Sequence, residues 1–481
     1  MTELDFYYLT PILIVSIAPV VIMITIAWVR NYKIIYSFSI LAFAVALASN
    51  LMISIREFSA PTAVIHRIST LFTFDGYTFI LSSVVILSAL VVTYLSRGYL
   101  LYQESEKEEY FIILFVAVLG SLLLLASSNF ITLFLGIETL SISLYILVSY
   151  RRSRHKSLEA GVKYLVLASV ASAFLLFGMG LIYTQTGNLD FSEIRNLTIS
   201  AFRNPIFLTG FAMMMVGLGF KLALAPFHLW TPDVYEGAPV PVTTFISTIS
   251  KGSVIAVVLR FFYSVEGFNN QNLITIITLL AILSMFFGNI LAIRQQNIKR
   301  ILAFSSIANM GYLIVTLLIG GQQGISSAIF YIITYFIALL GAFGVITLLS
   351  DKDFEAEMLT DYRGLFWKQP LIAIVLTLCM LSLAGIPLTA GFMGKFYLIY
   401  AGVSSGLWLL MIVLVINSVI ALYYYLRIVT TMFTTSAESP QLTTISTTGN
   451  IVLSLIAIAI MWLGIFPQQI IRIISLFSNL G

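Results

Sequence analysis

The sequence has few charged residues and almost no cysteine. Lys, Arg, Asp and Glu make up 10% of its 481 residues, whereas a soluble domain carries about 25%. This scarcity excludes a set of soluble domains. The single Cys379 excludes a disulfide framework and a cysteine metal site within the chain, and the three histidines are too scattered to suggest a metal site. No segment resembles a phosphate loop, a dinucleotide fingerprint, a haem-ligand pair or an iron–sulfur motif, so we expect no redox centre or cofactor in this chain.

Hydrophobic sequence is abundant instead. Hydrophobic residues make up 59% of the chain, and its mean hydropathy is +1.01. Apolar runs of about 20 residues, the length that spans a bilayer, recur almost without pause. The sequence therefore predicts an all-α polytopic membrane protein. Its fourteen expected spans are 7–29, 34–54, 77–96, 111–128, 130–150, 160–184, 206–235, 240–263, 273–293, 300–318, 324–349, 370–400, 406–433 and 449–468.

The distribution of basic residues predicts the orientation. If the N-terminus lies outside, fifteen Lys and Arg residues fall in cytoplasmic loops and six fall in outside loops, namely Arg56, Arg67, Arg195, Arg203, Arg260 and Arg472. Cytoplasmic loops are the ones enriched in Lys and Arg, so both termini are expected on the non-cytoplasmic side. The N-terminal residues are acidic rather than basic, which favours a retained first span over a signal peptide.

Two long spans are interrupted by proline, at Pro226 and Pro387. Each comes one span after a Gly/Ala-rich segment, starting near Glu159 and Gly324. The offset between them is five spans, an odd number, so equivalent units have opposite orientations. Inverted repeats with paired broken helices are typical of transporters. We therefore predict three N-terminal helices in 1–110, two inverted five-helix repeats in 111–265 and 266–433, and a C-terminal helix in 434–481.

The spans contain an unusual set of charges: one carboxylate, Glu138, and three amines, Lys221, Lys251 and Lys395. A charge at the centre of a membrane helix costs about 2.5–3.5 kcal/mol on insertion scales, so each is a functional-site hypothesis. Glu138 and Lys221 are expected to pair. The pair either controls how readily the lysine exchanges a proton or only ties two helices together.

The surroundings of the lysines suggest routes for protons. Pro226 opens the helix beside Lys221, and the freed carbonyls at that depth require protein partners or a wet cavity. His228 beside the break either bridges protons or is a hydrogen-bonded interior histidine. Three hydroxyl residues precede Lys251 at helical spacing, namely Thr244, Ser247 and Thr248. They either form a proton wire together with waters or serve as small residues for helix packing. Lys395 lies in the second broken span, either as an interior group or snorkelling to an interface.

Several motifs resemble one known family. The segment Phe220–Val242 (FKLALAPFHLWTPDVYEGAPVPV), leading to Lys251, resembles the N-type antiporter-like subunits of bacterial respiratory complex I, the proton-pumping NADH:quinone oxidoreductase. Further matches are GIETLS at 136–141, NIKRILAFSS at 297–306 and LAGIPLTAGF at 383–392. The resemblance covers most of the chain. One departure is Asn309, where relatives often have histidine.

The resemblance implies a role and a setting. Glu138 and Lys221 would form the ion pair of one half-channel, Lys251 the connecting lysine and Lys395 the terminal lysine of the other, with Lys299 as a lower-ranked inlet candidate. NADH, FMN, iron–sulfur clusters and quinone would belong to other subunits. The partners would be the M-type subunit, small K/J-type membrane subunits and the lipid bilayer of the bacterial inner membrane, with no nucleic acid.

Other classes of membrane protein would use the same interior Glu and Lys residues. A subunit of a multi-chain cation/proton antiporter needs the same constellation and no redox partner. A passive scaffold would use the lysines to hold helices together. Related assemblies take electrons from ferredoxin, a reduced deazaflavin or formate. The motifs leave these alternatives open.

Overall fold

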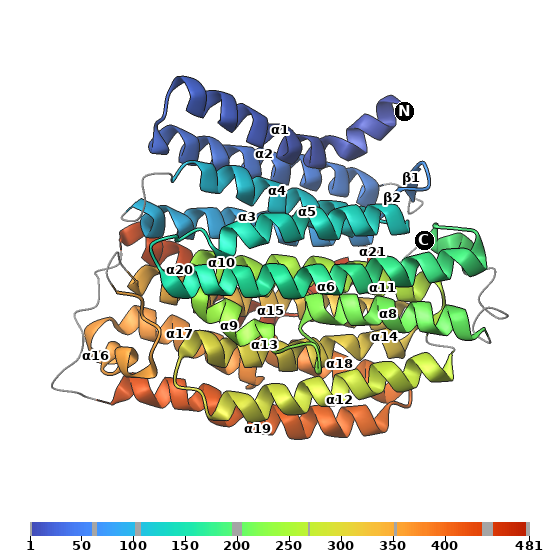
Figure 1. Cartoon of the computed structure of the whole chain (residues 1–481). Coiled ribbons are helices and arrows are strands. Elements are labelled where there is room, and N and C mark those ends of the chain that lie inside the picture. Colours follow the sequence, from blue (N-terminus) through green and yellow to red (C-terminus); the bar gives the residue numbers. More distant parts are fainter. Residues whose placement is uncertain are drawn as a thin grey trace.

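The computed structural model describes residues 2–59, 65–101, 107–194, 204–267, 270–350, 354–434 and 446–477. Within these ranges, thirteen helices are long and apolar enough to cross a membrane. The remaining expected span, 370–400, is divided into two shorter helices. The helices run roughly side by side in one bundle (Figure 1). The predicted all-α polytopic membrane fold is confirmed.

In lipid, a helix is favoured because it satisfies its own backbone hydrogen bonds. The helices of the first half are α1 (Glu3–Trp28), α2 (Tyr32–Ser59), α3 (Gly76–Leu101), α4 (Glu109–Ala126), α5 (Phe130–Val148), α6 (His155–Thr186), α8 (Pro205–Leu222), α9 (Trp230–Gly237), α10 (Val240–Phe245), η1 (Ile246–Ser250) and α11 (Lys251–Ser264). Those of the second half are α12 (Gln271–Ile293), α13 (Ile298–Ile314), α14 (Thr316–Ile319), α15 (Gly321–Leu349), η3 (Leu359–Tyr362), α16 (Leu365–Lys368), α17 (Pro370–Ala384), α18 (Ala390–Ser404), α19 (Trp408–Phe433), α20 (Thr447–Ile465) and α21 (Gln468–Phe477).

Burial separates central helices from peripheral ones. The most apolar stretches of the 240–264 and 298–319 crossings are 100% buried, whereas that of α1 is 28% buried and that of α2 is 33% buried. Figure 1 accordingly shows α1 and α2 at one edge of the bundle and α12 and α19 near the other. The crossing that carries Lys251 therefore lies in the protein interior rather than against lipid.

The bundle has two ends, which we call the termini face and the opposite face. At the termini face, a hairpin of β1 (His66–Ile68) and β2 (Phe72–Phe74) lies beside the start of α1, where His66 Nε2 and Asp5 Oδ1 are 2.8 Å apart. At the opposite face, the start of α6 meets the end of α9, where Lys156 and Glu236 form a 2.8 Å salt bridge. The termini face is the one expected to be non-cytoplasmic.

Both predicted breaks are present. α8 ends at Leu222, Ala223 adopts a left-handed φ of 60°, and α9 begins at Trp230. α17 ends at Ala384, followed by Gly385 with a φ of 85°, and α18 begins at Ala390. The first broken crossing runs towards the opposite face. The second runs towards the termini face, where Ser405 donates to the Ile319 carbonyl at the end of α14. This opposite direction agrees with inverted repeats, while the five-helix equivalence itself stays a prediction.

The expected inventory of interior charges is wrong. Arg260, assigned to an outside loop, is 3% exposed within α11, where it pairs with the equally buried Asp75. Lys299, assigned to a cytoplasmic loop, is fully buried in α13. All three residues lie near span ends, where hydropathy does not separate loop from interior. Arg195 and Arg203, also assigned to outside loops, lie outside the described residues.

Candidate functional site

Lys221 lies in the last turn of α8, immediately before the first break. Its ammonium is buried and donates a 2.5 Å hydrogen bond to Ser141 Oγ on α5. The rings of Tyr145, Tyr164 and Phe220 surround it, with centroids 5.7–6.0 Å from Nζ. A cation near aromatic faces gains electrostatic stabilisation that partly replaces lost hydration. The site therefore holds an ammonium through one hydroxyl and three rings.

Glu138 and Lys221 do not form the direct ion pair expected of them. The half-buried Glu138 carboxylate accepts a 2.5 Å hydrogen bond from Ser172 Oγ on α6. Lys221 instead contacts Ser141, one turn further along α5. Glu138 and the Ser141 that binds Lys221 therefore lie on neighbouring turns of one face of α5, and each charge is bonded to a serine hydroxyl. In this arrangement, the distance between the two charges can change without breaking a salt bridge.

Lys251 occupies the centre of the bundle. It is fully buried, and its Nζ donates a 2.7 Å hydrogen bond to Ser306 Oγ on α13. Two tyrosine hydroxyls also form hydrogen bonds with Ser306 Oγ, that of Tyr335 at 2.8 Å and that of Tyr235 at 3.3 Å. Ser306 is therefore the centre of a polar cluster built from four crossings. This role of Ser306 could not be predicted from the sequence, because a single serine in a helix usually bonds its own backbone.

The segment before Lys251 differs from a regular helix. Residues Ile246–Ser250 form a π-helical turn, η1, and such turns occur often at functional sites. The hydroxyls considered for a proton wire satisfy nearby carbonyls of the same segment. Thr244 donates to Val240, and Ser247 and Thr248 both donate to the Thr244 carbonyl. These contacts favour the packing interpretation for the three side chains.

Lys395 is an interior group, not a snorkelling one. Its Nζ donates to the carbonyls of Leu383 and Ala384, each at 3.0 Å. These are terminal carbonyls of α17, and the carboxyl end of a helix attracts cations. The break itself therefore provides the partners of this ammonium. The Tyr312 ring, with its centroid 5.2 Å from Nζ, covers another side.

Polar side chains connect the surroundings of Lys251 and Lys395. The Tyr331 hydroxyl donates to Asn309 Oδ1 at 2.6 Å, and Asn309 Nδ2 donates to the Ser305 carbonyl at 2.7 Å. A cavity with about 10 Å³ of space for a water centre is lined by Asn309, Tyr331, Tyr335 and Lys395, among others. That is about the size one water molecule needs. Asn309 thus serves as a hydrogen-bonding link that cannot itself titrate.

His228 lies in the first break and is buried. Neither ring nitrogen has a hydrogen-bond partner in the described part of the chain. Its ring stacks at 6.1 Å on Phe287 of α12. The described contact of this histidine is thus the packing of its ring on Phe287, and its role in proton transfer stays a prediction.

The opposite face carries a charged network around Lys299. Its Nζ donates to the carbonyls of Glu236 and Ala238 at 2.7 and 2.9 Å, and Glu355 lies 3.5 Å away. Arg154 pairs with both Glu355 and Glu357. Lys299 lies two turns before Ser306 on α13, so the network occupies the end of the bundle below Lys251.

A second buried pair joins α3 to α11 at the termini face. Arg260 makes two hydrogen bonds to the Asp75 carboxylate, at 2.8 and 2.9 Å. Arg260 also donates to Thr78, and Thr78 in turn donates to Asp75 through both its N–H and its hydroxyl. Such a bidentate pair suits a structural clamp, although the buried Arg260 Nε has no hydrogen-bond partner among the described residues.

No group of three or more His, Cys, Asp or Glu side chains suited to a metal ion occurs among the described residues.

A family model described as NADH:quinone oxidoreductase/Mrp antiporter, transmembrane, matches residues 127–421. The chain belongs to this family. The match includes both breaks, Glu138 and all three lysines of the site. It ends before α20 and α21 and begins after α1–α4, so the first three predicted helices and the C-terminal helix lie outside it.

Solved structures agree with the family. A chain of respiratory complex I from Thermus thermophilus, solved with bound aureothin, has 29% identity and a TM-score of 0.82, with 96% of this chain and 98% of that chain covered. A chain of the archaeal membrane-bound sulfane sulfur reductase has 24% identity, a TM-score of 0.84 and coverages of 98% and 96%. A chain of the Mrp complex from Dietzia has 19% identity, a TM-score of 0.87 and coverages of 99% and 97%. The chain is therefore similar over its whole length to antiporter-like membrane subunits.

Proposed function

We propose that this chain translocates protons across the bacterial inner membrane as the N-type antiporter-like subunit of NADH:quinone oxidoreductase. One observation carries the proposal. Lys221, Lys251 and Lys395 are buried, and in the described part of the chain none of them forms a salt bridge. Burial without a direct salt bridge disfavours the ammonium, so a change around a lysine, such as a movement of Glu138 relative to Lys221, would alter its tendency to give up or accept a proton.

The contacts suggest an order of transfer. Movement of Glu138 relative to Lys221 would change the stability of the Lys221 ammonium and drive its proton towards Lys251. Ser306 and Tyr335 would then receive the Lys251 proton, since both hydroxyls lie in its hydrogen-bonded cluster. The small cavity beside Asn309 would hold the water that leads to Lys395. Release from Lys395 towards the termini face completes the transfer.

The energy would come from other subunits. NADH oxidation through FMN and iron–sulfur clusters, followed by quinone reduction, would take place in partner chains, and this chain would hold no redox centre. A conformational or electrostatic signal would reach Glu138 along neighbouring M-type and small K/J-type membrane subunits. The 29% identity with a chain of respiratory complex I supports this host.

The test is the ratio of protons moved to electrons transferred. In inverted vesicles, Lys251→Ala and Lys395→Ala should lose most proton translocation per NADH oxidised. Lys163→Ala is the matched control, because Lys163 is exposed and, within the described part of the chain, pairs only with Glu159 and Asp233 at the surface. Full pumping by both interior variants would refute the relay. Loss of assembled complex in both, with normal pumping by what remains, would support a scaffold instead.

A second candidate is a subunit of a multi-chain cation/proton antiporter, favoured by the family's inclusion of Mrp antiporters. Isolation of the tagged chain distinguishes the hosts. Rotenone- or piericidin-sensitive NADH:quinone reductase activity would support the proposal. A large complex without it, whose membranes carry out sodium-dependent transport in the absence of NADH, would support the antiporter. A complex that accepts another electron donor would keep the relay and change the host.

A further inference from the structure

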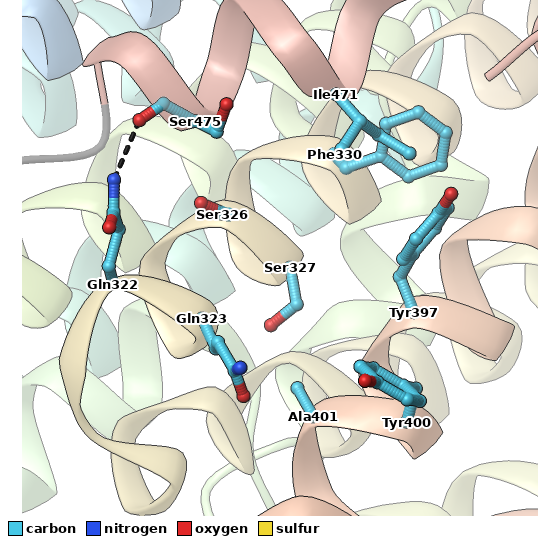
Figure 2. A pocket seen from close by; sticks show the side chains of 10 residues that line it. All are labelled: Gln322, Gln323, Ser326, Ser327, Phe330, Tyr397, Tyr400, Ala401, Ile471 and Ser475. Carbon is cyan, nitrogen blue, oxygen red and sulfur yellow. Dashed lines mark hydrogen bonds between the residues drawn. The ribbon is translucent and has the colours of Figure 1, made fainter. Parts of the chain in front are cut away.

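A pocket at the termini face lies between α15, α18 and α21 (Figure 2). It has about 220 Å³ of space, and none of the ten residues that line it is charged. The proposed proton relay uses none of these residues. The wall formed by α21 lies beyond residues 127–421, which the family model matches, so membership of the family does not account for this pocket.

The lining changes from polar to apolar with depth in the bundle. α15 begins at the termini face, and Gln322 and Gln323 of its first turn line the outer end of the pocket. Phe330 lies seven residues beyond Gln323, which places it about 10 Å deeper along the helix axis. Figure 2 shows the two amide side chains and the Phe330 ring at different ends of the pocket. On α15, the pocket therefore has an amide end and an aromatic end.

The other two helices follow the same order. α18 runs towards the termini face, and Tyr397 lies seven residues, about 10 Å, before its end. The rings of Tyr397 and Phe330 meet edge to face, with centroids 5.5 Å apart. On α21, Ile471 lies one turn before Ser475, whose carbonyl accepts a 2.7 Å hydrogen bond from the Gln322 side chain at the outer end (Figure 2). All three helices thus place a large apolar side chain at the deep end.

The pocket reaches the exposed surface of the bundle at Tyr400. This residue lines the pocket and is 60% exposed. Trp408, at the start of α19 on the same face of the bundle, is also exposed. Tyrosine and tryptophan gather where the acyl chains of a bilayer meet its headgroups. These two side chains therefore indicate that the outer end of the pocket lies at the level of the headgroups.

Helix α21 covers one side of the pocket. Its sequence, QQIIRIISLF, places isoleucines and polar residues on different faces, as in helices that lie at a membrane interface. Arg472 is the only charged residue of this helix and is exposed. A guanidinium binds phosphate oxygens through paired N–H groups. The helix therefore combines an apolar wall with a cation suited to a phosphate.

We propose that this pocket binds one acyl chain of a phospholipid from the non-cytoplasmic leaflet, with the ester groups at the Gln322–Gln323 end and the phosphate beside Arg472. An uncharged, largely apolar lining suits a hydrocarbon chain and disfavours an ion, which would lose its hydration without gaining a charged partner. The bound chain fills the space between α21 and the bundle and so holds α21 against α15 and α18. This inference does not depend on the proton relay.

The test uses phosphatidylglycerol that carries a diazirine in the middle of one acyl chain. The assembled complex, isolated through a tag on this chain, is reconstituted with this lipid, washed extensively with detergent and irradiated. Crosslinked peptides are then mapped by mass spectrometry. Exposed side chains of α19, namely Val415 and Val419, provide the internal control for lipid on an open surface.

Two substitutions compare a filled pocket with an open one. Ala401→Phe places a ring in the pocket, because Ala401 lines it and is buried. Ser404→Phe is the matched control, because Ser404 is exposed at the end of α18 and does not line the pocket. Both variants are washed and irradiated in the same way as the unmodified complex.

We expect the pocket peptides to retain about ten times more crosslink after washing than the α19 peptides, because an enclosed chain dissociates more slowly than one on an open surface. Ala401→Phe should lose this crosslink and Ser404→Phe should keep it. Pocket peptides that lose their crosslink as fast as the α19 peptides, or never gain one, would overturn the proposal. Displacement by added decylubiquinone would also overturn it and assign the pocket to a quinone. If Ala401→Phe does not assemble, the washing comparison on the unmodified complex still decides.

Discussion

Ser306 offers the sharpest test of the central cluster. Its hydroxyl oxygen accepts from the Lys251 ammonium at 2.7 Å and from Tyr335 at 2.8 Å, and it lies 3.3 Å from the Tyr235 hydroxyl. Ser306→Ala removes this oxygen while changing little volume. A hydrogen bond to a charged group contributes about 1.5–3 kcal/mol. If the oxygen stabilises the proton in transit, this loss slows transfer by about ten- to one hundred-fold, since each 1.4 kcal/mol is a factor of ten.

The measurement is the initial rate of acidification of inverted vesicles, with electron transfer recorded in parallel. Ser253→Ala is the control: Ser253 is as buried as Ser306 and lies on the Lys251 helix, but among the described residues its hydroxyl bonds only the Ile249 carbonyl. Ser306→Thr should restore much of the rate because it returns the hydroxyl. Equal pumping by Ser306→Ala and Ser253→Ala would refute the view that Ser306 serves the proton path.

Two further predictions concern structure around the site. Asp75→Asn should destabilise the solubilised chain by about 3–5 kcal/mol in thermal unfolding, because it leaves Arg260 buried without its counter-charge. Replacing both Asp75 and Arg260 by apolar residues should recover most of this loss. An unchanged unfolding temperature for Asp75→Asn would contradict the clamp. Gly391→Ala should lower pumping because its Cβ would overlap the Ser382 carbonyl at the second break. Gly180→Ala, whose Cβ would have no neighbouring atom within 4 Å among the described residues, should leave proton pumping unchanged in the same assay.

The sequence was sufficient to predict the crossings and both breaks. Long apolar runs determine helices in lipid, and proline within such a run removes a backbone hydrogen bond wherever the chain folds. The burial of Lys221, Lys251 and Lys395 followed from the same runs. These features depend on local sequence, so they could be predicted without knowledge of tertiary contacts.

Features that depend on contacts between distant segments could not be predicted. Asp75 and Arg260 each lie near a span end and become an interior pair only because α3 packs against α11. Ser306 acquires its role from three other crossings. The serine contacts that separate Glu138 from Lys221, the π-helical turn before Lys251 and the covering helix α21 likewise depend on packing. Hydropathy and spacing contain no information about these partners.

All three lysines lie away from the ends of their crossings, and this would have an electrical consequence. Lys221 and Lys395 are bonded at or beside mid-crossing breaks, and Lys251 lies near the middle of its 240–264 crossing. Moving one charge across 100 mV requires about 2.3 kcal/mol. In the proposed relay, a proton that passes from one lysine to the next would travel along the membrane plane, so it would cross little of that voltage. The membrane potential would therefore oppose chiefly the entry of protons near Lys299 and their exit beyond Lys395. It would leave proton transfer between the lysines almost unaffected.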